Sequence, residues 1–172
     1  MNHSIIDGFI LKHFSKGILI DTNVLLLFLI GIFDENYINK FKRTKKYSIE
    51  DFYIVKSIIL RFKKIIVTPQ ILAELSNLSC QMDKSRLGQY FSYFIEIIKK
   101  SEEIYINKNQ LLEIILLSKF GITDLTIKES AKEYNYLVFT DDFKLFGYLS
   151  KNDIDVINLN YIRTELWLRN NK

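Results

Sequence analysis

Short apolar runs rich in isoleucine and valine alternate along the chain with longer stretches whose apolar residues recur every three or four positions. Short apolar runs are typical of buried strands, and the longer spacing is typical of helices with one buried face. The alternation predicts parallel strands joined by crossover helices, which is an α/β fold. The chain has no internal repeat and no low-complexity linker.

The predicted strands cover residues 18–21, 65–68, 104–106, 136–140 and 155–159. The predicted helices cover residues 24–33, 48–64, 68–78, 85–100, 109–120, 124–134, 143–152 and 160–170. Ser48 followed three residues later by Asp51 indicates a capping box at the start of one helix. Gly121 is expected to end the helix before it. Thr123 is expected to cap the next helix, which would place Asp124 at its first position.

Composition limits the class of protein. The chain has 172 residues, 48% hydrophobic and 26% charged, which predicts one domain able to bury a sizeable core. We expect this domain to cover residues 1–172, with a core at 17–160, a basic insertion at 34–47 and a C-terminal helix at 160–170. Cys80 is the single cysteine, so no internal disulfide can form and a small buried side chain is expected.

The apolar run from Val24 to Phe33 raises the question of a membrane span. A bilayer-spanning helix needs about 20 apolar residues, and this run is flanked by polar residues on both sides. We therefore expect a buried helix that lies on the sheet. The opening MNHSIIDGFI has no basic n-region and no small-residue cleavage site, so we expect no secretory signal and a cytoplasmic protein.

Positive charge is concentrated in one segment. Residues 40–64 hold nine Lys and Arg against two acids, which leaves the remainder of the chain mildly acidic at an overall charge of +4. A basic segment suits a polyanionic partner, and it equally suits a solvated loop that keeps an apolar chain in solution. The substrate-contact candidates are Lys42, Arg43, Lys45 and Lys46.

Acidic residues fall at the ends of the predicted elements. Asp21 ends the first strand, and Asp141 and Asp142 follow the strand at 136–140. Glu74 and Asp124 lie near the N-terminal ends of helices that follow strands. In an open α/β sheet these ends share one edge, which is where ligands bind. Each acid alone is explained as a helix cap or a surface side chain, so the convergence carries the inference.

Several carboxylates within a few Å repel one another by about 4 kcal/mol per close pair at an effective dielectric near 20. Something positive must compensate, and all-oxygen donors suit the hard cations Mg²⁺ or Mn²⁺. His3 and His13 lie in the N-terminal stretch far from these acids, and we expect both to be surface or incidental side chains. Carboxylate-bound cations activate water and clamp phosphates during in-line displacement.

The acidic motifs resemble those of the PIN-domain family, the metal-dependent ribonucleases that include VapC-type toxins. They are DTN at 21–23, the Glu of TPQILAELSNL, the Asp of GITDLTIKESAKEY and the TDD of YLVFTDDFKL, in this order. The resemblance covers residues 17–160. It implies four catalytic metal ligands, which are Asp21, Glu74, Asp124 and Asp142. Asp141 is the implied substitute for Asp142, and Asn23 and Thr140 are implied to support the carboxylates through hydrogen bonds.

The resemblance also implies a Rossmann-like three-layer α/β/α fold with a mainly parallel sheet. It implies hydrolysis of RNA phosphodiester bonds by metal-bound hydroxide, with an antitoxin protein as a further partner if the chain is a toxin. The alternative is a PIN-like module that binds RNA or protein without cutting. The long interval between Asp21 and Glu74 departs from compact family members because it holds the basic insertion. Aromatic residues of the 85–100 helix serve either core packing or a homodimer.

Overall fold

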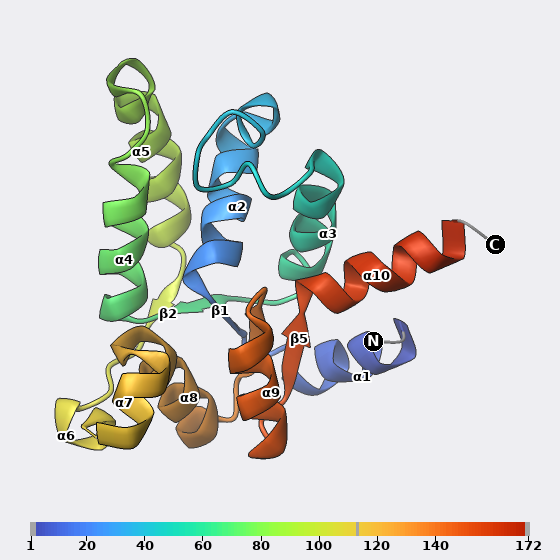
Figure 1. Ribbon diagram of the computed structural model, residues 1–172, viewed down its shortest axis with the longest axis vertical. Coiled ribbons are helices and arrows are strands. Elements are labelled where there is room, and N and C mark those ends of the chain that lie inside the picture. The colour runs from blue at the N-terminus through green and yellow to red at the C-terminus, as the bar shows by residue number, and fades with distance from the viewer. Residues whose placement is uncertain (1–2, 113, 171–172) are drawn as a thin grey trace.

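A five-stranded parallel sheet forms the centre of the chain in the computed structural model, which describes residues 3–112 and 114–170 (Figure 1). The strand order is β3-β2-β1-β4-β5. The strands are β1 (Ile18–Ile20), β2 (Ile65–Val67), β3 (Glu102–Glu103), β4 (Leu137–Thr140) and β5 (Val156–Asn158). The α/β class and the parallel sheet expected from the sequence are confirmed.

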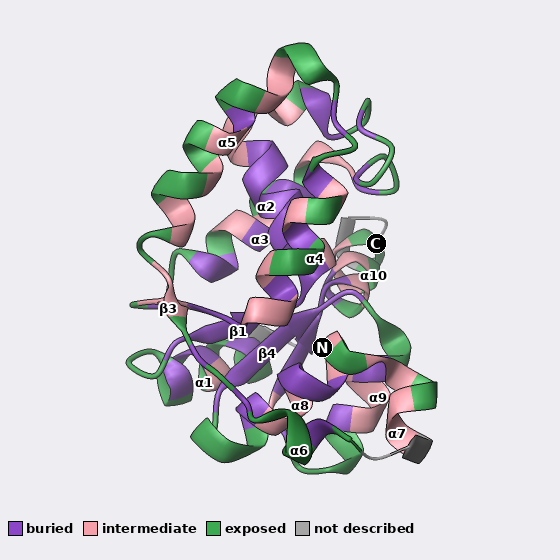
Figure 2. Cartoon of the chain, turned by 90° about the vertical axis from the view of Figure 1, so that its left-hand side faces the viewer, coloured by how far each residue is buried: buried purple, intermediate pink, exposed green. Residues whose placement is uncertain are grey.

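Helices flank this sheet. They are α1 (His3–His13), α2 (Thr22–Phe33), η1 (Glu35–Tyr37), α3 (Ile49–Ile59), α4 (Pro69–Ser79), α5 (Lys84–Ile98), α6 (Lys108–Leu111), α7 (Ile114–Phe120), α8 (Ile122–Tyr134), α9 (Phe143–Lys151) and α10 (Leu159–Asn170). Helices α2, α3, α4 and α5 lie on one side of the sheet, and α1, α8 and α9 lie on the other (Figure 1 and Figure 2). The arrangement is Rossmann-like.

Helix α2 is the centre of the core on its side of the sheet. Every residue from Val24 to Gly31 is buried, and the helix packs against α3, α4 and α5 (Figure 2). A helix that is apolar all round must be buried on all sides, which explains the uninterrupted run in the sequence. In the described part of the chain, no helix has the length and apolar character needed to cross a bilayer.

Helix caps follow the sequence in part. Ser48 and Asp51 form the predicted capping box, but α3 ends at Ile59 and not at residue 64. The N-cap of α8 is Gly121, with φ of 81°, and not Thr123. Glycine is favoured there because a side chain is strained at that φ, and the earlier start places Asp124 on the third helical residue and not the first.

Two further predicted elements are wrong in their bounds. The strand expected at 104–106 is instead the pair Glu102–Glu103, because β2 gives way after Val67 to the cap of α4 and offers little further edge for pairing. The helix expected at 109–120 is split into α6 and α7, with Leu112 at φ −88° and ψ 53°. Residue 113, between them, lies outside the described part.

Two side-chain predictions are also wrong. His13 is fully buried and not at the surface: its Nδ1 lies 3.1 Å from the carbonyl oxygen of Asn135, and its Nε2 lies 2.7 Å from Asp155 Oδ2. Because both partners accept hydrogen bonds, two ring N–H donors satisfy this geometry. Cys80 is exposed and not buried, because it follows the last turn of α4.

The basic insertion is a folded segment and not a free arm. Its aromatic side chains Tyr37, Phe41 and Tyr47 are buried in the main core, and Thr44 Oγ1 donates to the carbonyl oxygen of Ile38 at 2.8 Å. On α5, Tyr90 is fully buried and contacts Ser79, which confirms core packing for that residue. The lysines of the insertion are exposed on this fixed frame.

Candidate functional site

The chain changes direction in the sheet between β1 and β4. From β1 the sheet continues through β2 on one side and through β4 on the other, so the carboxyl ends of β1 and β4 meet at a topological switch point. Open α/β sheets bind ligands in the crevice at such a point. Asp21 directly follows β1, and Asp141 and Asp142 directly follow β4. Strand order therefore brings these residues together across a long interval of sequence.

A pocket of about 610 Å³ opens there, and we call it the acidic pocket. All four acids expected as ligands line it, together with polar side chains and an apolar wall. Its lining is Asp21, Asn23, Gln70, Ala73, Glu74, Asn77, Leu78, Phe120, Gly121, Ile122, Thr123, Asp124 and Asp142. The predicted convergence of the acids on one rim is thus present in the structure.

Asp21 is the most buried of these acids, with 6% of its surface exposed. Thr140 Oγ1 donates to Asp21 Oδ2 at 2.7 Å, which holds the carboxylate against the end of β4 as expected for a supporting residue. Burial raises the pKa of Asp21 to about 7, the Thr140 hydrogen bond opposes this rise, and the charges of neighbouring acids add to it. The chain therefore holds an ionisable group where ionisation costs free energy.

Glu74 reaches the pocket from α4. Thr22 Oγ1 donates to Glu74 Oε2 at 3.0 Å, which ties the carboxylate to the first turn of α2. Gln70 lies one turn before Glu74 on the same face of the helix, and its buried Oε1 has no hydrogen-bond partner among the described residues. Thr22 and Gln70 were not foreseen, although the spacing of four between Gln70 and Glu74 was a usable signal.

Asp124 and Asp142 complete the acidic pocket from α8 and α9. Burial raises the pKa of Asp124 to about 6, the charges of Asp142 and Glu74 raise it further, and Lys144 opposes them. Asp142 caps α9, since its Oδ1 accepts from the backbone N–H groups of Lys144 at 2.6 Å and Leu145 at 2.9 Å. One oxygen serves both bonds, so capping does not require the other oxygen of this carboxylate.

Asp141 has partners in the basic insertion. Its Oδ2 accepts from Lys46 Nζ at 2.5 Å and from the Tyr47 hydroxyl at 2.7 Å, and it is not part of the lining of the acidic pocket. Burial raises the pKa of Tyr47, which keeps its hydroxyl protonated as a donor. Of the two adjacent acids, Asp142 is therefore the one that faces the pocket. Asp141 is still close enough for its charge to raise the pKa of Asp21.

The basic insertion contacts the loop after β4 through Asp141. Lys46 holds Asp141, whereas Arg43 Nε donates to Gln81 Oε1 at 2.7 Å, and neither side chain lines the acidic pocket. Lys42 and Lys45 are exposed and are also absent from its lining. The structure brings none of the four predicted substrate-contact residues into the acidic pocket itself.

The donor set can be compared with the needs of a cation. Within residues 3–112 and 114–170, no three His, Cys, Asp or Glu side chains are already arranged around a common metal position. Mg²⁺ typically keeps several waters and is bound through one or two carboxylates. The carboxylate oxygens of the lining, the raised pKa values of Asp21 and Asp124 and the unpartnered Gln70 Oε1 fit such a hydrated cation.

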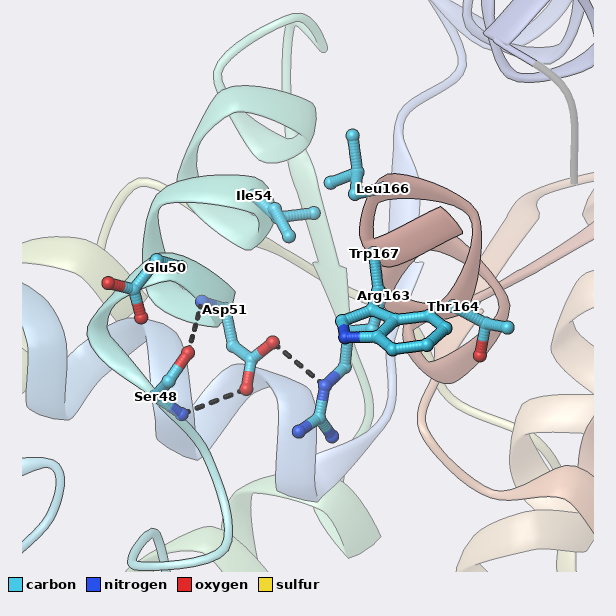
Figure 3. A pocket seen from close by; sticks show the side chains of 8 residues that line it. All are labelled: Ser48, Glu50, Asp51, Ile54, Arg163, Thr164, Leu166 and Trp167. Atoms are coloured by element: carbon cyan, nitrogen blue, oxygen red, sulfur yellow. Dashed lines mark hydrogen bonds and ion pairs between the residues drawn. The ribbon is translucent and has the colours of Figure 1, made fainter. Parts of the chain in front are cut away.

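A second pocket, of about 580 Å³, lies between α3 and α10 (Figure 3). Two of its charged groups, Arg163 and Asp51, are paired with each other: Arg163 Nε lies 2.9 Å from Asp51 Oδ1. Asp51 Oδ2 also accepts from the backbone N–H of Ser48 at 2.8 Å. Ile54 and Trp167 contribute apolar surface beside this pair (Figure 3). Asp51 and Arg163 hold the two helices together, so this pocket offers less chemistry than the acidic pocket.

Comparisons of the chain with protein-family models, with curated proteins and with solved structures give no match. Fold and site geometry are therefore the observations from which function is inferred. They establish a Rossmann-like α/β protein whose carboxylates Asp21, Glu74, Asp124 and Asp142 line one pocket at the topological switch point of its sheet.

Proposed function

We propose that the chain is a metal-dependent endoribonuclease of the PIN-domain type, which hydrolyses RNA phosphodiester bonds. One observation carries the proposal: four carboxylates from separate elements line a single pocket at the carboxyl edge of the sheet, and the most buried of them is Asp21. Packing like charges together opposes folding, so selection for stability alone does not account for the arrangement. A divalent cation offsets this repulsion.

In this proposal Asp21, Glu74, Asp124 and Asp142 hold Mg²⁺ or Mn²⁺, directly or through water. The bound cation supplies an activated water and neutralises charge on the phosphate. Thr140 orients the Asp21 carboxylate and Thr22 orients that of Glu74 through the hydrogen bonds described above.

The polar rim has its own part in the proposal. Asn23, Gln70 and Asn77 supply side-chain amides to the lining of the acidic pocket. Amide N–H groups can donate to phosphate oxygens or to water around the cation. Asp141 serves as a support, because Lys46 and Tyr47 hold its carboxylate and so fix the loop that carries Asp142.

A cleavage assay tests this function. Purified protein should cut single-stranded RNA with Mn²⁺ or Mg²⁺, stop on addition of EDTA, and lose activity in Asp21→Asn. Asp7→Asn makes the same chemical change at an exposed ion pair with Arg61 and should leave cleavage intact. Cleavage that persists in a folded Asp21→Asn protein would reject the site.

The alternative is a binding module that holds RNA or protein without cutting. The same assay separates the two, because such a module would retain RNA in a gel-shift experiment with Mn²⁺ and release no shorter product. A toxin of a toxin–antitoxin pair is the narrower form of the proposed function. It predicts that expression of the wild-type chain arrests bacterial growth, that Asp21→Asn does not, and that a co-encoded antitoxin protein relieves the arrest.

A further inference from the structure

Positive charge lies beside one wall of the acidic pocket, although neither lysine that supplies it is part of the lining. Phe120, at the end of α7, lines the pocket, and two ammonium groups lie over its ring. Lys119 Nζ is 5.2 Å and Lys144 Nζ is 5.0 Å from the ring centroid. Tyr148 supports the ring from α9, with 4.6 Å between centroids. We call Lys119, Phe120 and Lys144 the cationic wall.

Lys144 is held at this position from both ends. Its backbone N–H donates to the Asp142 carboxylate, and its ammonium donates to the carbonyl oxygen of Lys119. The ammonium is close enough to Asp124 for its charge to oppose the rise in the pKa of that acid. Lys144 therefore lies near Asp124, and within residues 3–112 and 114–170 it forms no ion pair with any of the four carboxylates.

The position of Lys144 conflicts with local helix preference. It is the second residue of α9, and a cation near a helix N-terminus meets the positive end of the helix dipole. Residues that break a local rule without evident gain in stability are expected at functional sites. Both lysines are also exposed, so a bound anion can reach their ammonium groups where they stand.

We propose that the cationic wall binds a backbone phosphate of single-stranded RNA next to the phosphate held at the acidic pocket. This inference rests on the proposed function. A polyanion that approaches four carboxylates needs cationic contacts outside the metal position. Lysine is a mobile point charge that meets phosphates without reading bases, so the contact positions the strand and does not select sequence. The Phe120 ring keeps both ammonium groups at the rim through cation–π contact.

The test compares Lys144→Gln with Lys151→Gln, which removes the same charge from the other end of α9. Binding is measured by fluorescence anisotropy with a labelled single-stranded oligoribonucleotide in EDTA, in an Asp21→Asn background that prevents cleavage. Lys144→Gln should raise Kd about threefold to tenfold at low salt. It should also reduce the slope of log Kd against log salt by about 0.7, the value for one lost phosphate contact on a single strand. Lys144→Arg should restore both.

A purely structural lysine gives a different result. Lys144→Gln would then lower the melting temperature well beyond the roughly 2 °C expected of a surface change, with the salt slope unaltered. Equal Kd and equal salt slope for the Lys144 and Lys151 variants would reject phosphate binding by the cationic wall. If the wild type still cuts RNA, the proposed nuclease function stands despite that result. Absence of both RNA binding and cleavage in the wild type would overturn both proposals together.

Discussion

Replacing Asp21 with asparagine should stabilise the metal-free protein while abolishing its metal response. The carboxylate is buried among other acids and accepts one hydrogen bond, from Thr140. Asparagine has almost the same shape and its side-chain carbonyl can accept that bond. The substitution therefore removes the cost of a buried negative charge and keeps the packing.

The pKa of Asp21 sets the size of the effect. Burial raises this pKa from 3.8 to about 7, and each pKa unit corresponds to about 1.4 kcal/mol. The folded chain binds the proton more tightly than the unfolded chain. The buried carboxyl therefore costs no stability below about pH 4, the cost of ionising it grows between about pH 4 and pH 7, and it stays constant above that. Asp21→Asn should gain about 4 kcal/mol in free energy of unfolding at pH 8 and almost nothing at pH 4.

Urea denaturation in EDTA, followed by circular dichroism at several pH values, measures this difference directly. The gain of the variant over the wild type should rise between pH 4 and pH 8, and Asp7→Asn should show no such rise. With Mn²⁺ the order should reverse, because only the wild type binds the ion and is stabilised by it. A variant that is less stable than the wild type at pH 8 in EDTA would refute the reasoning.

Further predictions concern the core and the metal. Gly31→Ala should lower the free energy of unfolding by about 3 kcal/mol, because its Cβ would lie 2.1 Å from Phe52, and urea denaturation measures the loss. Asp155→Asn should cost about 2 kcal/mol near neutral pH by removing the partner of buried His13, again measured in urea. Burial alone would raise the pKa of Asp155, but its hydrogen bonds with Lys12 and His13 together outweigh burial and lower that pKa. The stability that the Asp155 carboxylate contributes is therefore present above its ordinary pKa and is lost in acid, where variant and wild type should be equally stable. Mn²⁺ should raise the melting temperature of the wild type, and EDTA should reverse the shift.

The parallel sheet was predictable because its signal is local. Runs such as 18–20 and 137–139 are apolar throughout, as strands covered on both faces must be, and the apolar residues of α2 required burial on every side. The convergence of Asp21 with Asp142 also followed from sequence, since both directly follow parallel strands. Rules of sheet geometry were sufficient for this inference.

Contacts between distant side chains were not predictable in the same way. The contacts of Lys46 and Tyr47 with Asp141 depend on the path that residues 34–47 take between α2 and α3, and no local sequence pattern encodes that path. The burial of His13 was not predicted, since its partner Asp155 is remote in sequence. The bounds of β3 depend on the length of the neighbouring strand β2, and the break after α6 depends on packing between short helices. The helix and strand propensities of single residues indicate neither of these.

The most direct test of the metal centre is crystallography with Mn²⁺ and anomalous scattering at the manganese edge. The account predicts an anomalous peak in the acidic pocket among Asp21, Glu74, Asp124 and Asp142, and its loss in Asp21→Asn crystals. A well-ordered pocket without a peak at saturating Mn²⁺, or a peak elsewhere only, would contradict the account.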